Sequence, residues 1–287
     1  MKAIYKKEVK SYLTSIIGYV FIFFILLLEG IYFTAYNLQN AYPLFGTTLS
    51  AVTFIFLILV PVLTMKTIAE ERKQKTDQLL LTAPVSVSEI VLGKFLAVAT
   101  VYAIPVLIIC LYPMIMGKYG TVSYAMAYTA VLGFALLGFA QIAVGVFWSS
   151  VTENPVIAAV VTFIVLFVCY MITGIGSLIP DSSMASLACY MLLVLLAAVW
   201  IYHMIRNLWI AAVIGIAGEA ALAITYVVKS TLFEGSIQKF LAVFDITSHF
   251  DNFTNGILDL QGVVYFLSVI IIFLVLTVQT ITKRRWN

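Results

Sequence analysis

Residues 95–116 read FLAVATVYAIPVLIICLYPMIM, an uninterrupted run with no charged side chain. Roughly 20 apolar residues in a helix cross the hydrocarbon core of a bilayer, which is about 30 Å thick. Backbone N–H and C=O groups find no water there, so they must bond to each other within the segment, as they do in a helix. This stretch therefore predicts a transmembrane helix.

Similar apolar runs recur along the chain, which is 63% hydrophobic and 10% charged over 287 residues, with a mean hydropathy of +1.10. A soluble domain carries about a quarter charged residues, so the composition excludes an ordinary globular protein. We expect an all-α integral membrane protein, a polytopic bundle of about eight helices forming a single domain over 1–287. The predicted spans are 17–36, 47–65, 95–116, 123–148, 155–178, 188–203, 208–228 and 262–282. The short turn at 203–207 leaves a re-entrant hairpin open as an alternative for the sixth and seventh spans.

Positive charges divide unevenly between the predicted loops. With eight spans and the N-terminus inside, only Lys118, Lys229 and Lys239 of the 16 Lys and Arg residues fall outside. Cytoplasmic loops are enriched in Lys and Arg, so we expect both termini in the cytoplasm.

Two segments have the pattern of helices that lie on the membrane surface. Residues 1–16 place Tyr5, Val9, Leu13 and Ile16 at helical spacing, with four lysines mostly elsewhere around the helix. Such a helix buries its apolar face at the lipid boundary, although a basic tail that only sets topology is the alternative. The outer loop 229–261 repeats the pattern, and we expect a second amphipathic helix over 236–254, either interfacial or re-entrant, that caps the bundle outside.

The substantial inner loop, 66–94, begins with a charged segment suited to a helix and continues with Leu79, Leu80 and Leu81. Pro84 should end that helix, because proline lacks an N–H and restrains the residue before it. Ser86 or Ser88 then caps the next helix, with Glu89 placed as in a capping box. We expect a short rigid helix that offers charges and a leucine knob to a cytoplasmic partner; a solvated connecting loop is the alternative.

The sequence here resembles a known family. EERK at 70–73, Thr76, LLLTAPVS at 79–86 and IVLGK at 90–94 resemble the signature region of ABC-2-type transporter permeases. The chain is most similar to the gliding-motility and nitrous-oxide-operon branch of bacterial permeases. Three motifs later in the sequence resemble the same branch. These later motifs are FDNFTNGILDL at 250–260, VYFLS at 264–268 and KRRW at 283–286.

The resemblance implies a permease subunit, in the cytoplasmic membrane of a bacterial cell, of an ATP-driven transporter that is more often an exporter. The loop 66–94 would be the coupling helix that docks on a separate ATP-binding subunit, and residues 2–16 the N-terminal connecting helix. A second permease subunit, identical or paralogous, would complete the pathway. The residues implied in docking are Glu70, Glu71, Arg72, Lys73, Thr76, Asp77, Gln78, Leu79, Leu80 and Pro84.

Two residues depart from the family pattern, Lys75 where glycine is usual and Gln78 where glutamate is usual. The usual core has six spans, so the hairpin at 188–228 is an addition. The chain contains no Gly-x-x-x-x-Gly-Lys-Ser/Thr phosphate loop. We therefore expect this chain to be no enzyme and to bind no cofactor itself, with ATP and Mg²⁺ held by the partner subunit.

Glu29, Gln141 and Glu219 are polar side chains that fall inside predicted spans. A charge at mid-membrane costs roughly 2.5–3.5 kcal/mol, so these groups should face the bundle interior. They are the candidate polar site on a substrate path, with structural hydrogen bonding as the alternative, which is favoured for Gln141. Pro105 is either a hinge in the third span or a packing feature.

Other function classes have weaker support. His203 and His249 are isolated, and the three cysteines lie in or beside apolar runs, so we expect no metal site and no nucleic-acid partner. The main alternative is a related machine that passes ATP work to an extracytoplasmic auxiliary protein. An ion-driven secondary carrier and a passive scaffold are further alternatives.

Overall fold

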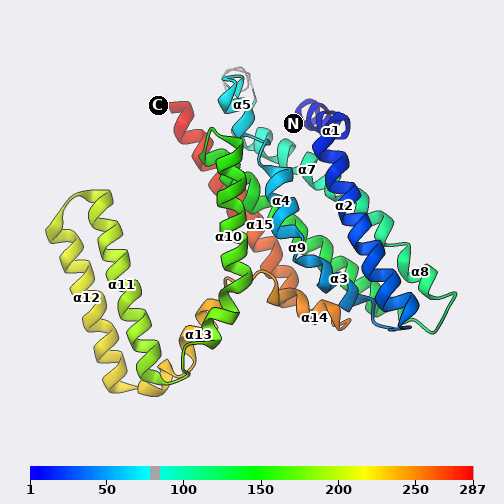
Figure 1. Ribbon diagram of the computed structural model, residues 1–287. Coiled ribbons are helices and arrows are strands. Elements are labelled where there is room, and N and C mark those ends of the chain that lie inside the picture. The colour runs from blue at the N-terminus through cyan, green and yellow to red at the C-terminus, as the bar shows by residue number, and fades with distance from the viewer. Residues whose placement is uncertain (78–84, 287) are drawn as a thin grey trace. The chain divides into compact units, whose positions relative to one another are not determined.

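The computed structural model describes residues 1–77 and 85–286, and every regular element in these ranges is a helix (Figure 1). The chain divides into two compact units, each described by itself below. Unit 1 comprises Met1–Val168 and Ile246–Asn287, and unit 2 comprises Cys169–Asp245. Helix α10 (Pro155–Ser177) begins in the first and ends in the second.

Helix α9 (Tyr124–Val151) is the centre of unit 1. It packs against α15 (Leu260–Trp286), α7 (Val87–Ile109), α3 (Phe45–Thr53) and α4 (Phe56–Thr64). Glycines bring these helices close together, as is common within membranes. A side chain on Gly138 would overlap the Tyr102 ring of α7, and one on Gly145 would overlap Thr64 of α4.

The N-terminal segment forms two helices, α1 (Lys2–Thr14) and α2 (Ile16–Tyr32), and α2 continues as a π-helix, η1 (Phe33–Gln39). Helix α2 buries one stripe at helical spacing and exposes large apolar side chains on the rest of its surface. The buried stripe consists of Gly18, Phe21, Ile25 and Glu29. The exposed face, which includes Phe23, Leu27 and Ile31, has the character of a surface in contact with lipid.

The predicted second span, 47–65, is broken. Helices α3 and α4 meet at a bend of 59°. At the bend two backbone hydrogen bonds connect residues three positions apart instead of four. Leu57 N donates to Phe54 O, and Ile58 N donates to Ile55 O. Pro61, inside α4, has no N–H to donate to the Leu57 carbonyl one turn earlier, so one backbone bond of α4 is missing close to the bend.

Helix α7 begins eight residues before the predicted third span, because the predicted capping box is present. Ser86 Oγ accepts a bond from Glu89 N, and Glu89 Oε2 accepts one from Ser86 N, both at 3.3 Å. The helix continues through buried Pro105 to Ile109 and is followed by the short α8 (Tyr112–Met116). A hinge at Pro105 stays a prediction.

The single amphipathic helix expected over 236–254 is absent. Instead the chain forms α13 (Ser236–Ala242) in unit 2, then η3 (Ser248–Phe250) and α14 (Asp251–Thr254) in unit 1. Phe250 and Phe253 are buried, and Phe253 packs on Gly133 of α9 and Gly262 of α15. These aromatic side chains therefore fill the core of unit 1. The helical periodicity predicts a lipid surface for them, and the structure differs from that prediction.

Unit 2 is built around an antiparallel hairpin of α11 (Ser183–Ile205) and α12 (Leu208–Val228), followed by η2 (Ser230–Phe233) and α13. Gly218 of α12 packs against Val194 of α11. The two ends of the hairpin lie close together, because Gly235 N donates to Asp181 O at 3.2 Å.

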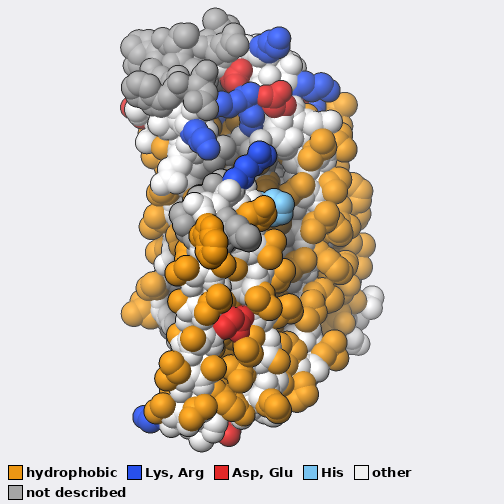
Figure 2. Space-filling view, turned by 90° about the vertical axis from the view of Figure 1, so that its left-hand side faces the viewer, with side chains coloured by type: hydrophobic (Ala, Val, Ile, Leu, Met, Phe, Trp, Pro, Cys, Tyr) orange, Lys and Arg blue, Asp and Glu red, His pale blue; other side chains and the backbone are white. Residues whose placement is uncertain are grey.

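Six helices among the described residues are long and apolar enough to cross a membrane, and up to eight if each of two bent pairs counts as one span. This confirms the predicted polytopic helical bundle. Hydrophobic side chains also cover most of the face drawn in Figure 2, where Lys, Arg, Asp and Glu gather mainly toward one end. The N-terminus, the C-terminus and the short helix α5 (Ala69–Lys73) lie at the same end of unit 1 (Figure 1).

Candidate functional site

The candidate site is built around α5, within the segment predicted from sequence to meet a partner. With five residues, this helix is far below the roughly 12 residues at which an isolated helix becomes even marginally stable in water. Its own N-cap, Ile68, has no side chain able to cap it. Ser149 of α9 does so instead, because its Oγ accepts bonds from Ile68 N and Ala69 N, both at 3.1 Å. The same hydroxyl donates to Met65 O at 3.1 Å, so α9 holds the start of α5.

Lys94 of α7 forms a buried ionic centre beside α5, with only 2% of its surface exposed. Its Nζ lies 2.9 Å from Glu71 of α5 and 3.1 Å from Glu8 of α1, and it donates to Thr67 O at 2.8 Å. An ammonium group has three N–H donors, so these three acceptors use its full capacity.

Helix α1 lies against α7 and contributes a second buried polar group, Tyr12. The Tyr12 hydroxyl donates to Leu63 O at 3.2 Å and bonds with Thr67 Oγ1 at 3.0 Å. Burial raises the pKa of this phenol well above its ordinary value, despite the bond with Thr67. The tyrosine therefore remains neutral at physiological pH.

The residues of α1 that pack against the protein are not those that the predicted lipid-facing stripe leaves for this side. Tyr5, which was expected on a lipid-facing stripe, bonds through its hydroxyl with Thr100 Oγ1 of α7 at 3.0 Å. Glu8 and Tyr12 are the buried residues of this helix. All four lysines of α1 are exposed, and Lys7 Nζ lies 3.3 Å from Glu71 Oε1.

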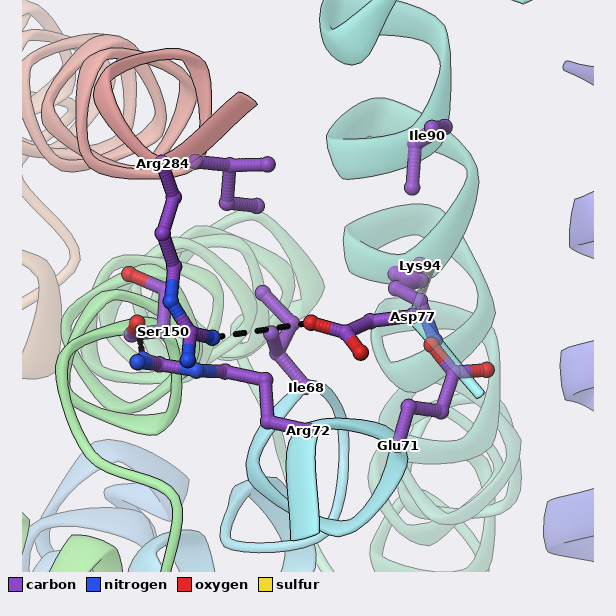
Figure 3. Close-up of a pocket in the computed structure, with 9 residues that line it drawn as sticks. Ile68, Glu71, Arg72, Asp77, Ile90, Lys94, Ser150 and Arg284 are labelled. Atoms are coloured by element: carbon purple, nitrogen blue, oxygen red, sulfur yellow. Dashed lines mark hydrogen bonds and ion pairs between the residues drawn. The ribbon is translucent and has the colours of Figure 1, made fainter. Parts of the chain in front are cut away.

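A second ionic cluster lies on the other side of α5 (Figure 3). Arg72 donates to Ser150 O at the end of α9, and its guanidinium lies 3.5 Å from Glu153. Arg284 of α15 pairs with the same Glu153 and lies 3.5 Å from Asp77. Burial and the neighbouring Arg284 lower the pKa of Arg72, which Glu153 and Asp77 oppose. Because Glu153 and Asp77 balance the two arginines, the cluster joins α5 to α9 and α15.

Two cavities adjoin α5. The first, drawn in Figure 3, measures about 30 Å³ and lies between the two ionic clusters, with Arg72, Asp77, Lys94 and Arg284 among its lining residues. Its volume suits about one water molecule. The second measures about 640 Å³ and is lined by polar residues of α1 and of the α5 region, including Ser11, Lys66, Glu70 and Gln74.

Among the described residues, no hydrogen bond or ion pair joins the outer side of the segment to another helix. Lys73, Gln74, Lys75 and Thr76 are exposed, and they form what is called the exposed strip below. Lys75 has a φ of +59°, in the left-handed region that favours glycine. This accounts physically for the usual glycine of the resembled pattern at this position.

The residues predicted to dock a partner thus divide into three groups. Glu71, Arg72 and Asp77 face other helices of their own chain, while Lys73 and Thr76 are exposed and Glu70 is half-buried beside Lys66 at 3.3 Å. Gln78, Leu79, Leu80 and Pro84 lie outside the described residues. A docking role for any of these residues stays a prediction.

Sequence reasoning missed Glu8 and Lys94 as members of the site. Lys94 entered the sequence analysis only as a cytoplasmic charge and as the end of the IVLGK motif, and Glu8 did not enter it. They lie 86 positions apart, so no local spacing connects them. The one available signal was a lysine directly before an apolar run, where burial of the adjacent turn forces the ammonium group to find partners.

The three polar residues predicted inside the membrane each have covered side-chain oxygens without a hydrogen-bond partner. Glu29 of α2 is fully buried and Gln141 of α9 is 2% exposed; neither carboxylate oxygen of Glu29 nor Gln141 Oε1 has a partner. Glu219 of unit 2 likewise has two covered, unbonded oxygens and lines an apolar cavity of about 620 Å³ between α11 and α12. Their place on a substrate path stays a prediction.

Metal binding finds no donor set in the described part of the chain, where no group of three or more His, Cys, Asp or Glu is placed to hold an ion.

Comparison with known protein families gives a match over almost the whole chain. A family model described as "ABC-2 family transporter protein" matches residues 2–284, and this range includes both ionic clusters. Comparison with curated proteins found no match.

Proposed function

Because the chain belongs to the ABC-2 family of transporter proteins, we propose that α5 and the exposed strip receive work from a separate ATP-binding subunit. The chain is a multi-pass membrane protein and the permease component of an ABC transporter. The finer proposal is that this permease exports its substrate and belongs to the gliding-motility and nitrous-oxide-operon branch.

One observation carries the proposal: a five-residue helix is attached to four longer helices on its inner side and is free on its outer side. Glu71 reaches α1 and α7 through Lys94, and Ser149, Arg72 and Asp77 reach α9 and α15. A partner that pushes the exposed strip therefore acts on membrane helices through the buried contacts of Lys94 and Ser149 and through the partly exposed ion pairs of Arg284. This is the arrangement expected of a force-receiving element.

In the proposed mechanism ATP, held with Mg²⁺ by the partner subunits, closes a dimer of ATP-binding domains. Closure draws together the segments Ile68–Leu81 of two permease subunits, identical or paralogous. The movement passes to α1 and α2, to α4 and, through Glu153 in the turn before it, to α10. The pathway between the two permeases then opens toward the outside, with the exposed strip on the cytoplasmic side.

The docking surface is tested by reversing charge on the exposed strip. The double variant Lys73→Glu, Lys75→Glu should lose co-purification with a co-expressed ATP-binding subunit, because two exposed cations become anions. The matched control is Lys6→Glu, Lys10→Glu, which makes the same charge change on the exposed side of α1. Unchanged co-purification of the α5 variant, with the permease still inserted in the membrane, contradicts the proposal.

Transport is tested separately in proteoliposomes that contain both subunits. ATP-dependent movement of a solute supports a transporter that moves its own substrate. ATP turnover without movement of any solute in the panel supports the alternative in which the work passes to an extracytoplasmic partner.

A further inference from the structure

Helix α5 lies between two sets of helices, and adjacent residues connect it to each. Glu71 pairs with Lys94 and so connects to the pair formed by α1 and α7. Arg72 bonds with Ser150 and Glu153 and so connects to α9 and the α9–α10 turn, to which Arg284 of α15 is also paired. Consecutive side chains on a helix point about 100° apart, which is why neighbours in sequence reach different helices.

The α1 and α7 pair is held together independently of Lys94. Gly93 of α7 packs against Ile4 of α1, where a Cβ would lie 3.3 Å from the Ile4 side chain. The Tyr5 hydroxyl bonds with Thr100, which lies about two turns beyond Gly93 along α7. These contacts make α1 and α7 one packed body at this end of unit 1.

The attachment of that body to α5, by contrast, depends on few groups. The cavity of about 640 Å³ is lined from one side by Lys7, Glu8, Ser11 and Tyr12 of α1 and from the other by residues 66–76. The Lys7–Glu71 pair crosses it, but the Lys7 side chain is 65% exposed, and exposed ion pairs contribute little. The buried connections are the Lys94 bonds to Glu71 and Thr67 O, and the bond of Tyr12 with Thr67.

We infer that Lys94 is a positioning residue that attaches the α1–α7 pair to α5, so that the pair moves together with α5. Lys94 does this through Glu71 of α5 and Glu8 of α1, which share one buried ammonium group. The source of the movement rests on the proposed function, whereas the attachment itself is a property of the permease alone.

The attachment is tested by distances between spin labels in the full-length permease. Labels are placed at Lys10→Cys on α1, Lys73→Cys on α5 and Lys283→Cys on α15, which are all exposed positions, after Cys110, Cys169 and Cys189 are replaced by alanine. In Lys94→Met we expect loss of the single narrow distance between α1 and α5. The distance between α5 and α15 should stay narrow, because Asp77, Arg72 and Arg284 remain. Arg72→Met is the matched opposite case, in which the α5–α15 distance is lost and the α1–α5 distance is kept.

A residue that only stabilised the fold would broaden both distances together, and that result overturns the inference. So does an unchanged α1–α5 distance in Lys94→Met. Glu71→Gln serves if Lys94→Met does not fold, since it removes the negative charge that Lys94 meets on α5. Its control is Glu70→Gln, which affects a surface pair with Lys66 and a bond from Gln74 within the same segment.

The joint movement is tested in the complex with the ATP-binding subunit, trapped with Mg-ATP and vanadate. The α1–α5 distance should be the same before and after trapping in the parent protein and should change in Lys94→Met. A changed distance in the parent protein overturns the inference. Failure to form any complex overturns the proposed function, while the distances in the permease alone still decide whether Lys94 joins the two bodies.

Discussion

At the scale of single residues, burial decides which charges of the inner segment act within the chain. Lys94 is 2% exposed and has three acceptors, whereas Lys73 and Lys75 are exposed. Removing one member of a buried ion pair leaves an uncompensated charge, which costs far more than losing an exposed charge. Charges of similar appearance in the sequence therefore have different roles, structural for Lys94 and available for a partner at the exposed strip.

Lys75 provides a test of backbone strain in the exposed strip. A non-glycine residue in the left-handed region costs roughly 1–2 kcal/mol, and a β-branched residue is worse still. We expect Lys75→Gly to give a more thermally stable permease than Lys75→Val, as measured by thermal unfolding in detergent.

The control for this comparison is Lys73, which is in the helical part of α5. There the order should reverse, because glycine is less favourable than valine inside a helix by a few tenths of a kcal/mol. A valine variant more stable than the glycine variant at both positions would show that the turn at Lys75 is not left-handed.

At the scale of elements, α5 is a helix whose stability comes from another helix. Ile68 and Ala69 are buried, and their amides both donate to Ser149 Oγ. The end of α9 and the start of α5 are therefore one hydrogen-bonded structure, although they lie about 80 residues apart in sequence. The capping box of α7, by contrast, is formed within four consecutive residues.

Ser149→Ala should loosen α5 specifically. The substitution leaves two buried amides without an acceptor, and each unsatisfied buried group costs about 1–3 kcal/mol. We expect faster hydrogen exchange at residues 68–73 and a lower unfolding temperature.

The neighbouring Ser150→Ala is the matched control for the capping role. The Ser150 hydroxyl only donates to Phe147 O in its own helix, so its loss should leave exchange at 68–73 unchanged. Equal effects of the two alanine substitutions would argue against capping by Ser149.

At the scale of the whole molecule, the two ionic clusters and the hairpin of α11 and α12 belong to different units. Every residue of the two ionic clusters belongs to unit 1, while α11, α12 and Glu219 belong to unit 2. The buried, unbonded carboxyl groups Glu29 and Glu219 accordingly lie in different units. The proposed docking segment and the hairpin therefore lie in different units.

Replacing residues 183–228 with a short Gly-Ser linker should preserve docking of the ATP-binding subunit. The ends of the hairpin lie close together, as the bond from Gly235 N to Asp181 O shows, so a short linker spans them. The expected result is unchanged co-purification with the ATP-binding subunit. Loss of co-purification by a permease that is still monodisperse and inserted would show that unit 2 takes part in docking.

The sequence by itself determined the helical membrane fold and most helix positions, because hydrophobicity and capping are local properties. The apolar runs located α2, α9, α10 and α15, and Ser86 with Glu89 marked the start of α7. The charged segment near residue 70 was recognised from its composition and from its resemblance to the family.

The tertiary structure alone decided which polar groups serve the fold and which remain exposed. The Lys94–Glu8 pair and the Ser149 cap join residues about 80 positions apart, so no periodicity predicts them. The burial of Phe250 and Phe253 likewise depends on neighbouring helices. In each case a local pattern sets how a segment folds, and contacts between distant segments set which face of it is covered.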